Sequence, residues 1–492
     1  MREVRPMSRV RRAARLAAAG MALVTAAGVA TPASARATSP TSTAFIRAFV
    51  VPATNPTNAF GSDVVAASDG GYVVAGVAGN NLYQGWVAKL SPSGSVQWQE
   101  ELGCGESGFS SVQPTTDGGY VLGGYSNDGC DPACKKPGIS FPGCAWVVKL
   151  SAAGTVEWQQ VLTGEDGATV AEVRQASDGG YYAAGSTDEI PGTSYAWVAR
   201  LAASGSIIWQ RRIGSPDGSQ ADSVAPAADG GVAVSGSTGI VGDSSILVAK
   251  LDGDGNLQWQ ERFSPGDHDG GYSIQPTTDG GYVVGGQVTT PPSTGSGEDD
   301  AVLLKLGSGG TVQWERRYTS PSTEYTGSSY GTTIYAVIQT ASGGYALAGD
   351  TQFPAENLIN APITGGSWLA TTDASGNITA QNAYYPVNPG TGNRYATDFY
   401  GLAQAGDGGL AAIGYVDEYN NSDDVWLVRT APDLSVGASC ADVHPVRNLT
   451  TVAGGLTATA SSLPATSPPV SGGATTFNYG AITPDLTSEQ DC

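Results

Sequence analysis

The segment Thr116-Asp117-Gly118-Gly119-Tyr120 decides the fold of this 492-residue chain. It lies between two short β-forming runs, at 111–113 and 120–122. Asp-Gly-Gly in such a setting predicts a hairpin, because glycine adopts the positive φ that tight hairpin turns need. Self-similarity makes the prediction strong. The block recurs seven times, at 68–72, 116–120, 177–181, 228–232, 278–282, 342–345 and 406–410.

Two further strands follow each hairpin. In the second copy the third strand is Trp146-Val147-Val148-Lys149-Leu150, and a glycine turn then precedes a strand that contains Trp158. Four antiparallel strands per unit and seven units predict an all-β protein, a seven-bladed β-propeller of four-stranded blades. We expect the fourth-strand tryptophan to pack between adjacent blades. The glycine and tryptophan are four residues apart in five copies, at Gly94/Trp98, Gly154/Trp158, Gly205/Trp209, Gly255/Trp259 and Gly310/Trp314.

The seventh copy indicates how the ring closes. Its third strand is at 425–429, but no glycine-to-tryptophan strand follows. A lone apolar strand, 45–50, precedes the first hairpin instead. We therefore expect this N-terminal strand to complete blade seven, which removes an open sheet edge. The expected propeller spans residues 44–430.

Composition agrees with an all-β fold and excludes several functions. The chain has 69 glycines, and each interior glycine costs a helix about 1 kcal/mol relative to alanine. With 24 Lys and Arg against 45 Asp and Glu, the net charge of −21 disfavours nucleic-acid binding. The 2 histidines cannot build a multi-histidine metal site.

The first residues are typical of a secretory signal peptide. Residues 2–15 hold six arginines, an apolar run follows at 16–30, and Ala33-Ser34-Ala35 fits a cleavage site. We expect residues 1–35 to be removed and the protein to be secreted, extracellular or held in the cell envelope. The apolar run is short for the ~20 residues of a membrane span. Cleavage would leave 18 basic and 44 acidic residues.

Export favours disulfide bonds between the cysteines. Four cysteines fall in or beside the loops of the second blade, and the sequence leaves their three possible pairings open. The last two bracket a Ser-, Thr- and Pro-rich extension at 431–492 and are expected to pair, so that the extension either packs on the propeller or forms a spacer. The six are Cys104, Cys130, Cys134, Cys144, Cys440 and Cys492.

The repeat resembles the exported β-propeller repeat proteins of bacteria and archaea, on its Asp-Gly-Gly-Tyr turn and its Lys-Leu…Gly-x-x-x-Trp segment. The Gly-x-x-x-Trp element is also similar to that of quinoprotein blades. Quinoprotein dehydrogenases imply eight blades and an adjacent cysteine pair, which this sequence lacks, so the resemblance implies the fold and not that activity.

Loop length points to one face of the ring. The short turns all fall on one face, and the long connections, 125–144, 287–300, 318–335, 350–367 and 382–400, fall on the other. Long loops on a rigid scaffold commonly carry binding sites. Tyrosine, with a flat apolar body and a polar tip, suits sugars or extended peptides. The candidate ligand-binding residues are Tyr325, Tyr330, Tyr385, Arg394, Tyr395, Tyr400, Tyr419 and Asp424.

Asp252-Gly253-Asp254-Gly255-Asn256 resembles the start of a calcium loop. It also replaces an ordinary turn of the repeat, and no cofactor other than this calcium is expected. Three functions stay open: a monomeric binding or scaffold protein for carbohydrate or protein, a hydrolase or lyase that uses paired carboxylates, and a surface protein without a ligand.

Overall fold

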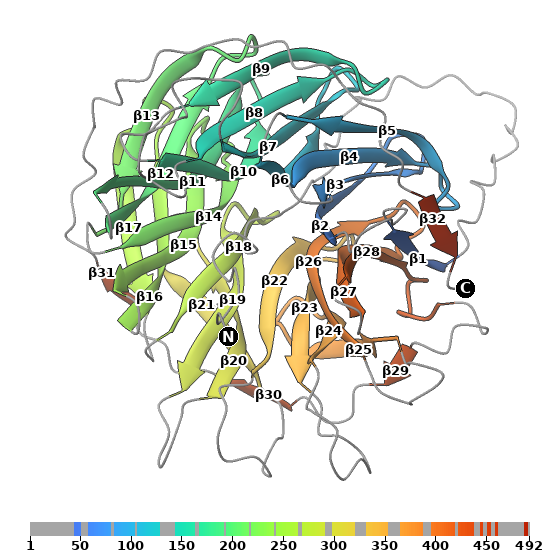
Figure 1. Cartoon of the computed structure of the whole chain (residues 1–492). Coiled ribbons are helices and arrows are strands. Elements are labelled where there is room, and N and C mark those ends of the chain that lie inside the picture. The colour runs from blue at the N-terminus through green and yellow to red at the C-terminus, as the bar shows by residue number, and fades with distance from the viewer. Residues whose placement is uncertain are drawn as a thin grey trace, which may run out of the picture.

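Seven antiparallel sheets form a ring in the computed structural model (Figure 1). The structure describes residues 44–50, 58–79, 83–103, 106–127, 143–162, 167–190, 193–215, 218–240, 243–263, 268–290, 298–319, 331–352, 365–386, 395–418, 422–436, 443–445, 450–453, 458–460 and 487–490. Within these ranges no helix has the length and hydropathy of a membrane span.

Each of the first six sheets is a blade of four consecutive strands. Blade 1 is β2 (Asn58–Ala66), β3 (Tyr72–Gly79), β4 (Gln84–Leu90) and β5 (Val96–Leu102). Blade 2 is β6 (Glu106–Pro114), β7 (Tyr120–Asn127), β8 (Cys144–Leu150) and β9 (Val156–Leu162). Blade 3 is β10 (Gly167–Gln175), β11 (Tyr181–Ile190), β12 (Thr193–Leu201) and β13 (Ile207–Ile213).

The next three blades continue this order. Blade 4 is β14 (Ser219–Pro226), β15 (Val232–Ile240), β16 (Asp243–Leu251) and β17 (Leu257–Phe263). Blade 5 is β18 (Gly270–Pro276), β19 (Tyr282–Thr290), β20 (Glu298–Leu306) and β21 (Val312–Thr319). Blade 6 is β22 (Thr333–Gln339), β23 (Tyr345–Gln352), β24 (Gly365–Thr372) and β25 (Ile378–Tyr384).

Blade 7 closes the ring as the sequence predicts. It contains β26 (Ala396–Gln404), β27 (Leu410–Glu418), β28 (Ser422–Arg429) and, as its fourth strand, β1 (Phe45–Val50). Phe45 pairs with Arg429 and Phe49 with Val425. The expected register is confirmed, and the two ends of the propeller sequence are joined in one sheet.

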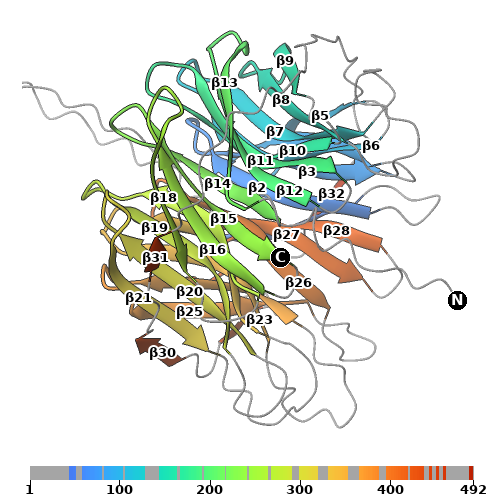
Figure 2. The same ribbon diagram turned by 90° about the vertical axis from the view of Figure 1, so that its left-hand side faces the viewer.

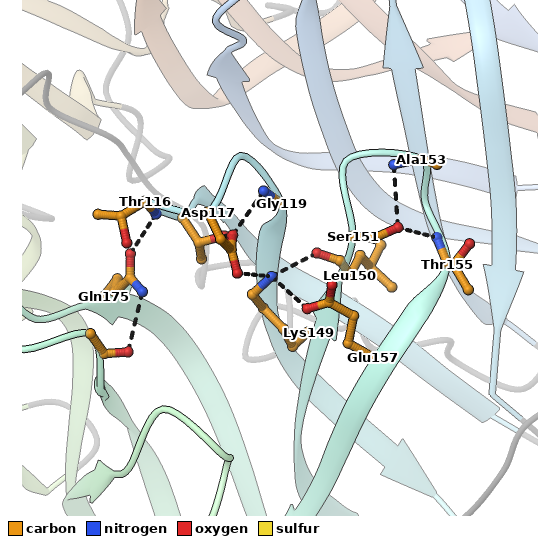
Figure 3. Close-up of polar contacts among 12 residues, drawn as sticks. Thr116, Asp117, Gly119, Lys149, Leu150, Ser151, Ala153, Thr155, Glu157 and Gln175 are labelled. Atoms are coloured by element: carbon orange, nitrogen blue, oxygen red, sulfur yellow. Dashed lines mark hydrogen bonds and ion pairs between the residues drawn. The ribbon is translucent and has the colours of Figure 1, made fainter.

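The repeated turns hold their shape through glycine and aspartate. The first glycine of each paired-glycine turn has a positive φ, 86° at Gly118. Asp117 accepts a hydrogen bond from the Gly119 amide, and its other oxygen lies 2.9 Å from Lys149 Nζ (Figure 3). Lys149 is buried, so this turn is tied to the third strand of its own blade. The same ion pair occurs at Asp69–Lys89, Asp178–Arg200, Asp229–Lys250, Asp279–Lys305 and Asp407–Arg429.

Aromatic residues fill the contacts between blades. The third-strand tryptophans are fully buried, as at Trp146. The fourth-strand tryptophans lie nearer the surface: the ring of Trp98 contacts Tyr120 of the next blade and packs where a side chain on Gly154 would collide with it. This agrees with the expected packing between blades.

The C-terminal extension adds a fifth strand to four blades. β29 (Val443–Pro445) pairs with β25, β30 (Thr450–Ala453) with β21, β31 (Ala458–Ala460) with β17, and β32 (Thr487–Gln490) with β1. These short strands lie on the outer rim of the ring (Figure 1). The described parts of the extension therefore pack on the propeller.

Candidate functional site

The two faces of the ring differ in their connections. The turn from the first to the second strand is short in every blade, and so is the turn from the third to the fourth strand in blades 1 to 6; all of these turns lie on one face. The connections between second and third strands, and from one blade to the next, lie on the other, which we call the loop face. Figure 2, a side view, shows the strands running between the two faces.

Every first strand carries a β-bulge in its loop-face half. In blade 6, Ile334 pairs with Gly349 and Ala336 with Ala348, which leaves Tyr335 as the extra residue. The glycine opposite is required, because a Cβ on Gly349 would lie 1.8 Å from the Thr333 carbonyl oxygen. The seven extra residues are Ser62, Ser110, Ala171, Asp222, Tyr272, Tyr335 and Tyr400.

In blades 1 to 5 the residue after the bulge links its blade to the next one. Asp63 accepts a hydrogen bond from the Val112 amide at 2.9 Å, and Glu172 accepts one from the Val224 amide at 2.8 Å. Serine hydroxyls play the same role in other blades: Ser111 Oγ accepts a hydrogen bond from the Val173 amide, and Ser223 Oγ accepts one from the Ile274 amide. First strands are innermost, and each contacts the next around a closed circle. These hydrogen bonds therefore join the inner strands of blades 1 to 6 to one another.

Aromatic rings form a continuous row on part of this inner wall. Tyr272 and Tyr335 have ring centroids 5.6 Å apart, and Tyr335 and Tyr400 5.2 Å. Tyr400 stacks on Tyr415 at 6.1 Å. The row then crosses to blade 1, where Phe60 lies 5.7 Å from Tyr415 and 6.0 Å from Tyr83. We call these six residues the aromatic row.

The aromatic row is accessible along most of its length. Tyr272 and Tyr400 are buried, whereas Tyr335, Tyr415, Phe60 and Tyr83 are half-buried. All six belong to the loop-face half of their strands or, for Tyr83, to the connection before β4. The bulge residues of blades 1 to 4 are serine, serine, alanine and aspartate. The inner wall is thus aromatic on one side and small or acidic on the other.

Polar groups accompany the rings. The Tyr400 hydroxyl donates to Asp398 at 3.1 Å, and Asp222 accepts from the Gln220 side chain at 3.2 Å. Burial raises the pKa of both Asp63 and Glu172. A raised pKa in a cleft can mark an acid catalyst, but both carboxylates are fully buried and hydrogen-bonded to backbone amides of the next blade. Linking the blades accounts for their burial.

Of the predicted ligand residues, only Tyr400 belongs to the aromatic row. Tyr385 and Asp424 are described and buried, and Tyr395 is half-buried against the core between blades 6 and 7. Tyr325, Tyr330, Arg394 and Tyr419 lie outside the described residues. The prediction did not include Tyr272 and Tyr335, the other two bulge tyrosines. Their signal in the sequence is their repeat position, since each lies, like Tyr400, eight residues before the first glycine of its paired-glycine turn.

The predicted calcium turn has the geometry of an ordinary turn. Asp252 Oδ1 accepts hydrogen bonds from the amides of Asp254 and Asn256 at 3.0 and 2.8 Å. Asp373 makes the same contacts with Ser375 and Asn377 in blade 6. The described ranges contain no cluster of three metal-ligating side chains. Calcium at Asp252 and Asp254 stays a prediction.

Cys144 opens β8 and takes part in a disulfide bond. The other predicted disulfide residues, Cys104, Cys130, Cys134, Cys440 and Cys492, lie outside the described residues, so the pairings stay predictions.

Several solved structures are similar to this chain at low sequence identity. No protein-family model matches the chain, and no curated protein matches its sequence. Similar solved structures include Sqt1 from Chaetomium thermophilum (12% identity, TM-score 0.42, covering 79% of this chain and 86% of that one). A protein of unknown function from Dyadobacter fermentans has 11% identity and a TM-score of 0.41, over 78% and 98% of the two chains. The periplasmic gluconolactonase PpgL of Pseudomonas aeruginosa has 13% identity and a TM-score of 0.38, over 65% and 84%.

Proposed function

We propose that this chain is a secreted binding protein that holds an extended carbohydrate against the aromatic row on the loop face. The observation that carries the proposal is the unbroken contact of six aromatic rings across blades 5, 6, 7 and 1. Aromatic rings with polar tips offer flat apolar surfaces and hydrogen-bonding groups side by side. A sugar ring presents the matching combination of apolar C–H faces and hydroxyl groups.

Charge narrows the class of ligand. The chain has a net charge of −21, and Asp222 and Asp398 lie at or beside bulges of the inner wall. Like charges repel during encounter and in the bound state. The expected ligand is therefore a neutral or basic glycan and not an acidic one.

Export fits this role. The N-terminal segment 1–35 has the pattern of a cleaved leader, and the disulfide at Cys144 is typical of an oxidising compartment. The hydrolase alternative has less support, because the two carboxylates with the clearest upward pKa shifts, Asp63 and Glu172, already serve the contacts between blades.

A screen of the mature chain, residues 36–492, tests the proposal. The protein is applied to an array of neutral, basic and acidic glycans and, in parallel, to a peptide library. We expect retention on a set of neutral or basic glycans. Retention on peptides alone would indicate that the site binds a protein and would refute the carbohydrate proposal. No retention on either panel would refute ligand binding.

A further inference from the structure

The first strands of the seven blades surround the axis of the ring (Figure 1). Each strand has a position two residues beyond the one that follows its bulge, on the same side of the strand and about 7 Å nearer the face of the short turns. We call this position the axial level. Blades 2, 3 and 5 carry Gln113, Arg174 and Gln275 there. These residues are only 4%, 6% and 3% exposed.

The side chain of Arg174 reaches from blade 3 to blade 5. Its Nη1 donates a hydrogen bond to Gln275 Oε1 at 3.1 Å, and its Nε lies 2.8 Å from Glu172 Oε1. Blade 4, which lies between, has the small residue Ala225 at the axial level. Polar side chains of different blades therefore meet at the axis of the ring.

A second carboxyl group lies close to this guanidinium group. Burial raises the pKa of Asp63 on blade 1, Glu172 on blade 3 raises it further, and Arg174 lowers it. The raised pKa favours the neutral form of Asp63. Glu172 keeps its charge through its contacts with Arg174, the Ser223 hydroxyl and the Val224 amide. One ion pair, Glu172 with Arg174, then carries the charge at the axis.

Three N–H groups at the axial level have no hydrogen-bond partner among the residues that the structure describes. They belong to Arg174 Nη2, Gln113 Nε2 and Gln275 Nε2, and all three atoms are buried. Arg174 Nη2 and Gln275 Nε2 are each joined through one carbon atom to the hydrogen bond between their side chains, so they lie close together. Gln113 belongs to β6, which contacts the strand of Arg174. A buried donor without an acceptor is costly.

Reassigning the Gln275 amide does not remove this excess of donors. Exchanging its oxygen and nitrogen atoms would place an NH2 group against Arg174 Nη1, which is also a donor. The guanidinium group has no acceptor to offer in any orientation. The axial level therefore needs an acceptor that the three side chains themselves do not provide.

From these donors we propose that the axis of the ring binds one small monovalent anion, of the size of chloride, between Arg174, Gln113 and Gln275. An anion accepts hydrogen bonds from all three N–H groups, and such charge-assisted bonds are the strong ones. The near-complete burial of the three residues favours a monatomic ion over a bulky one such as sulfate. The acidic surface of the chain opposes the approach of an anion only over a short range, because salt screens charges beyond about 8 Å.

The anion site is separate from the aromatic row. It lies on the other side of Asp63 and Glu172 from the bulges, so the glycan proposal and the anion proposal stand or fall independently. A bound anion would connect the first strands of blades 2, 3 and 5 across the axis. Because it binds only the folded ring, the stability of the propeller is expected to depend on chloride.

A bromide experiment on the unmodified protein tests the site directly. Crystals of the mature chain, residues 36–492, are soaked in sodium bromide, and an anomalous difference map locates bromine. We expect one peak at the axis, in contact with Arg174 Nη2. A water molecule at these donors in bromide-soaked crystals, with no bromine peak there, would overturn the proposal.

Urea unfolding measures the same binding in solution. Sodium chloride is varied while sodium gluconate keeps the ionic strength constant, and sodium sulfate serves as a second comparison salt. We expect the urea midpoint of the parent chain to rise with chloride concentration above the dissociation constant. Gln113→Leu and Arg174→Gln each remove one donor group to the anion and should raise the chloride concentration at which this rise begins at least about tenfold.

Gln210→Leu is the matched control, because Gln210 lies on the outer strand β13, where it accepts a hydrogen bond from Trp197 Nε1. This variant should lower the midpoint equally in all salts and keep the chloride dependence of the parent chain. A parent midpoint that does not respond to chloride would contradict the proposal. The same chloride dependence in Gln113→Leu and Arg174→Gln as in the parent chain would also contradict it.

Discussion

The ion pair between the Asp-Gly-Gly turn and the third strand offers a sharp test of what stabilises a blade. In blade 1 the Lys89 side chain is 7% exposed, and its Nζ lies 2.8 Å from Asp69 and 3.1 Å from the Leu90 carbonyl oxygen. In blade 2 Lys149 has the same contacts and a second carboxylate, Glu157, at 2.9 Å. Gln97 stands at the Glu157 position in blade 1. If the turn aspartate is removed from each of these two blades, Lys89 loses its carboxylate partner, whereas Lys149 keeps Glu157.

The expected cost of Asp69→Asn follows from burial. Breaking a buried pair by removing one partner costs about 3–5 kcal/mol, because the remaining charge is stranded. Asp69 is 48% exposed, so water reaches one side of this pair and the cost falls to about 2 kcal/mol. The side-chain oxygen of the substituted asparagine would still accept a hydrogen bond from the Gly71 amide, so the turn keeps this bond. Asp117→Asn should cost about 1 kcal/mol or less, because Lys149 keeps Glu157.

Urea unfolding followed by intrinsic tryptophan fluorescence measures both variants against the parent protein. A double variant, Asp117→Asn with Glu157→Gln, should lose more than the sum of its single variants, because only the double variant strands Lys149. Equal losses for Asp69→Asn and Asp117→Asn, together with additivity in blade 2, would refute the idea that the buried cation needs a carboxylate.

Two further predictions concern the bulge and the acid range. Gly185→Ala places a Cβ 1.8 Å from the Thr169 carbonyl oxygen and should lower the free energy of unfolding by about 3 kcal/mol or more. Gly179→Ala has open space around its Cβ but a φ of 88°, so it should lower the free energy of unfolding by only about 1–2 kcal/mol. Equal urea midpoints for the two variants would contradict this. Although burial opposes it, hydrogen bonds from threonine and lysine lower the pKa of Asp117 and of Asp279 to about 2. Their contribution to stability is therefore full above about pH 4 and is lost as the pH falls from about 4 to 2. The two Asp→Asn variants should show a weaker fall in urea midpoint over that window, and parallel curves for parent and variants would count against it.

The architecture could be predicted because it depends on local signals that repeat. Paired glycines fix the turns, and a missing fourth strand in the last unit together with a spare strand before the first one implies closure. The partnership of turn aspartate with third-strand lysine was also present in the sequence, since blade 6 has lost both, with Ser342 and Thr371 in their places. It becomes apparent only when the fold brings the two positions together.

The aromatic row could not be predicted in the same way. Tyr272, Tyr335 and Tyr400 are far apart in the chain, and each looks like an ordinary strand residue until the bulge is known. Loop length instead predicted ligand-binding residues such as Tyr385, whose side chain is buried in the structure. The sequence did not predict that the extension contributes edge strands, because each of these strands is only three or four residues long and gains its stability from the blade beside it.

Calorimetric titration of the tightest-binding glycan tests the central claim most directly. The parent chain is compared with two variants. The row variant carries both Tyr335→Ala and Tyr415→Ala, and the control variant carries Tyr195→Ala, at a half-buried tyrosine of blade 3 outside the aromatic row. Loss of stacking area on two rings predicts an affinity at least about tenfold lower for the row variant, since aromatic contacts contribute roughly 0.5–1.5 kcal/mol each beyond the area they bury. The account predicts that loss together with unchanged affinity for Tyr195→Ala. Equal affinity for the parent chain and the row variant would contradict it.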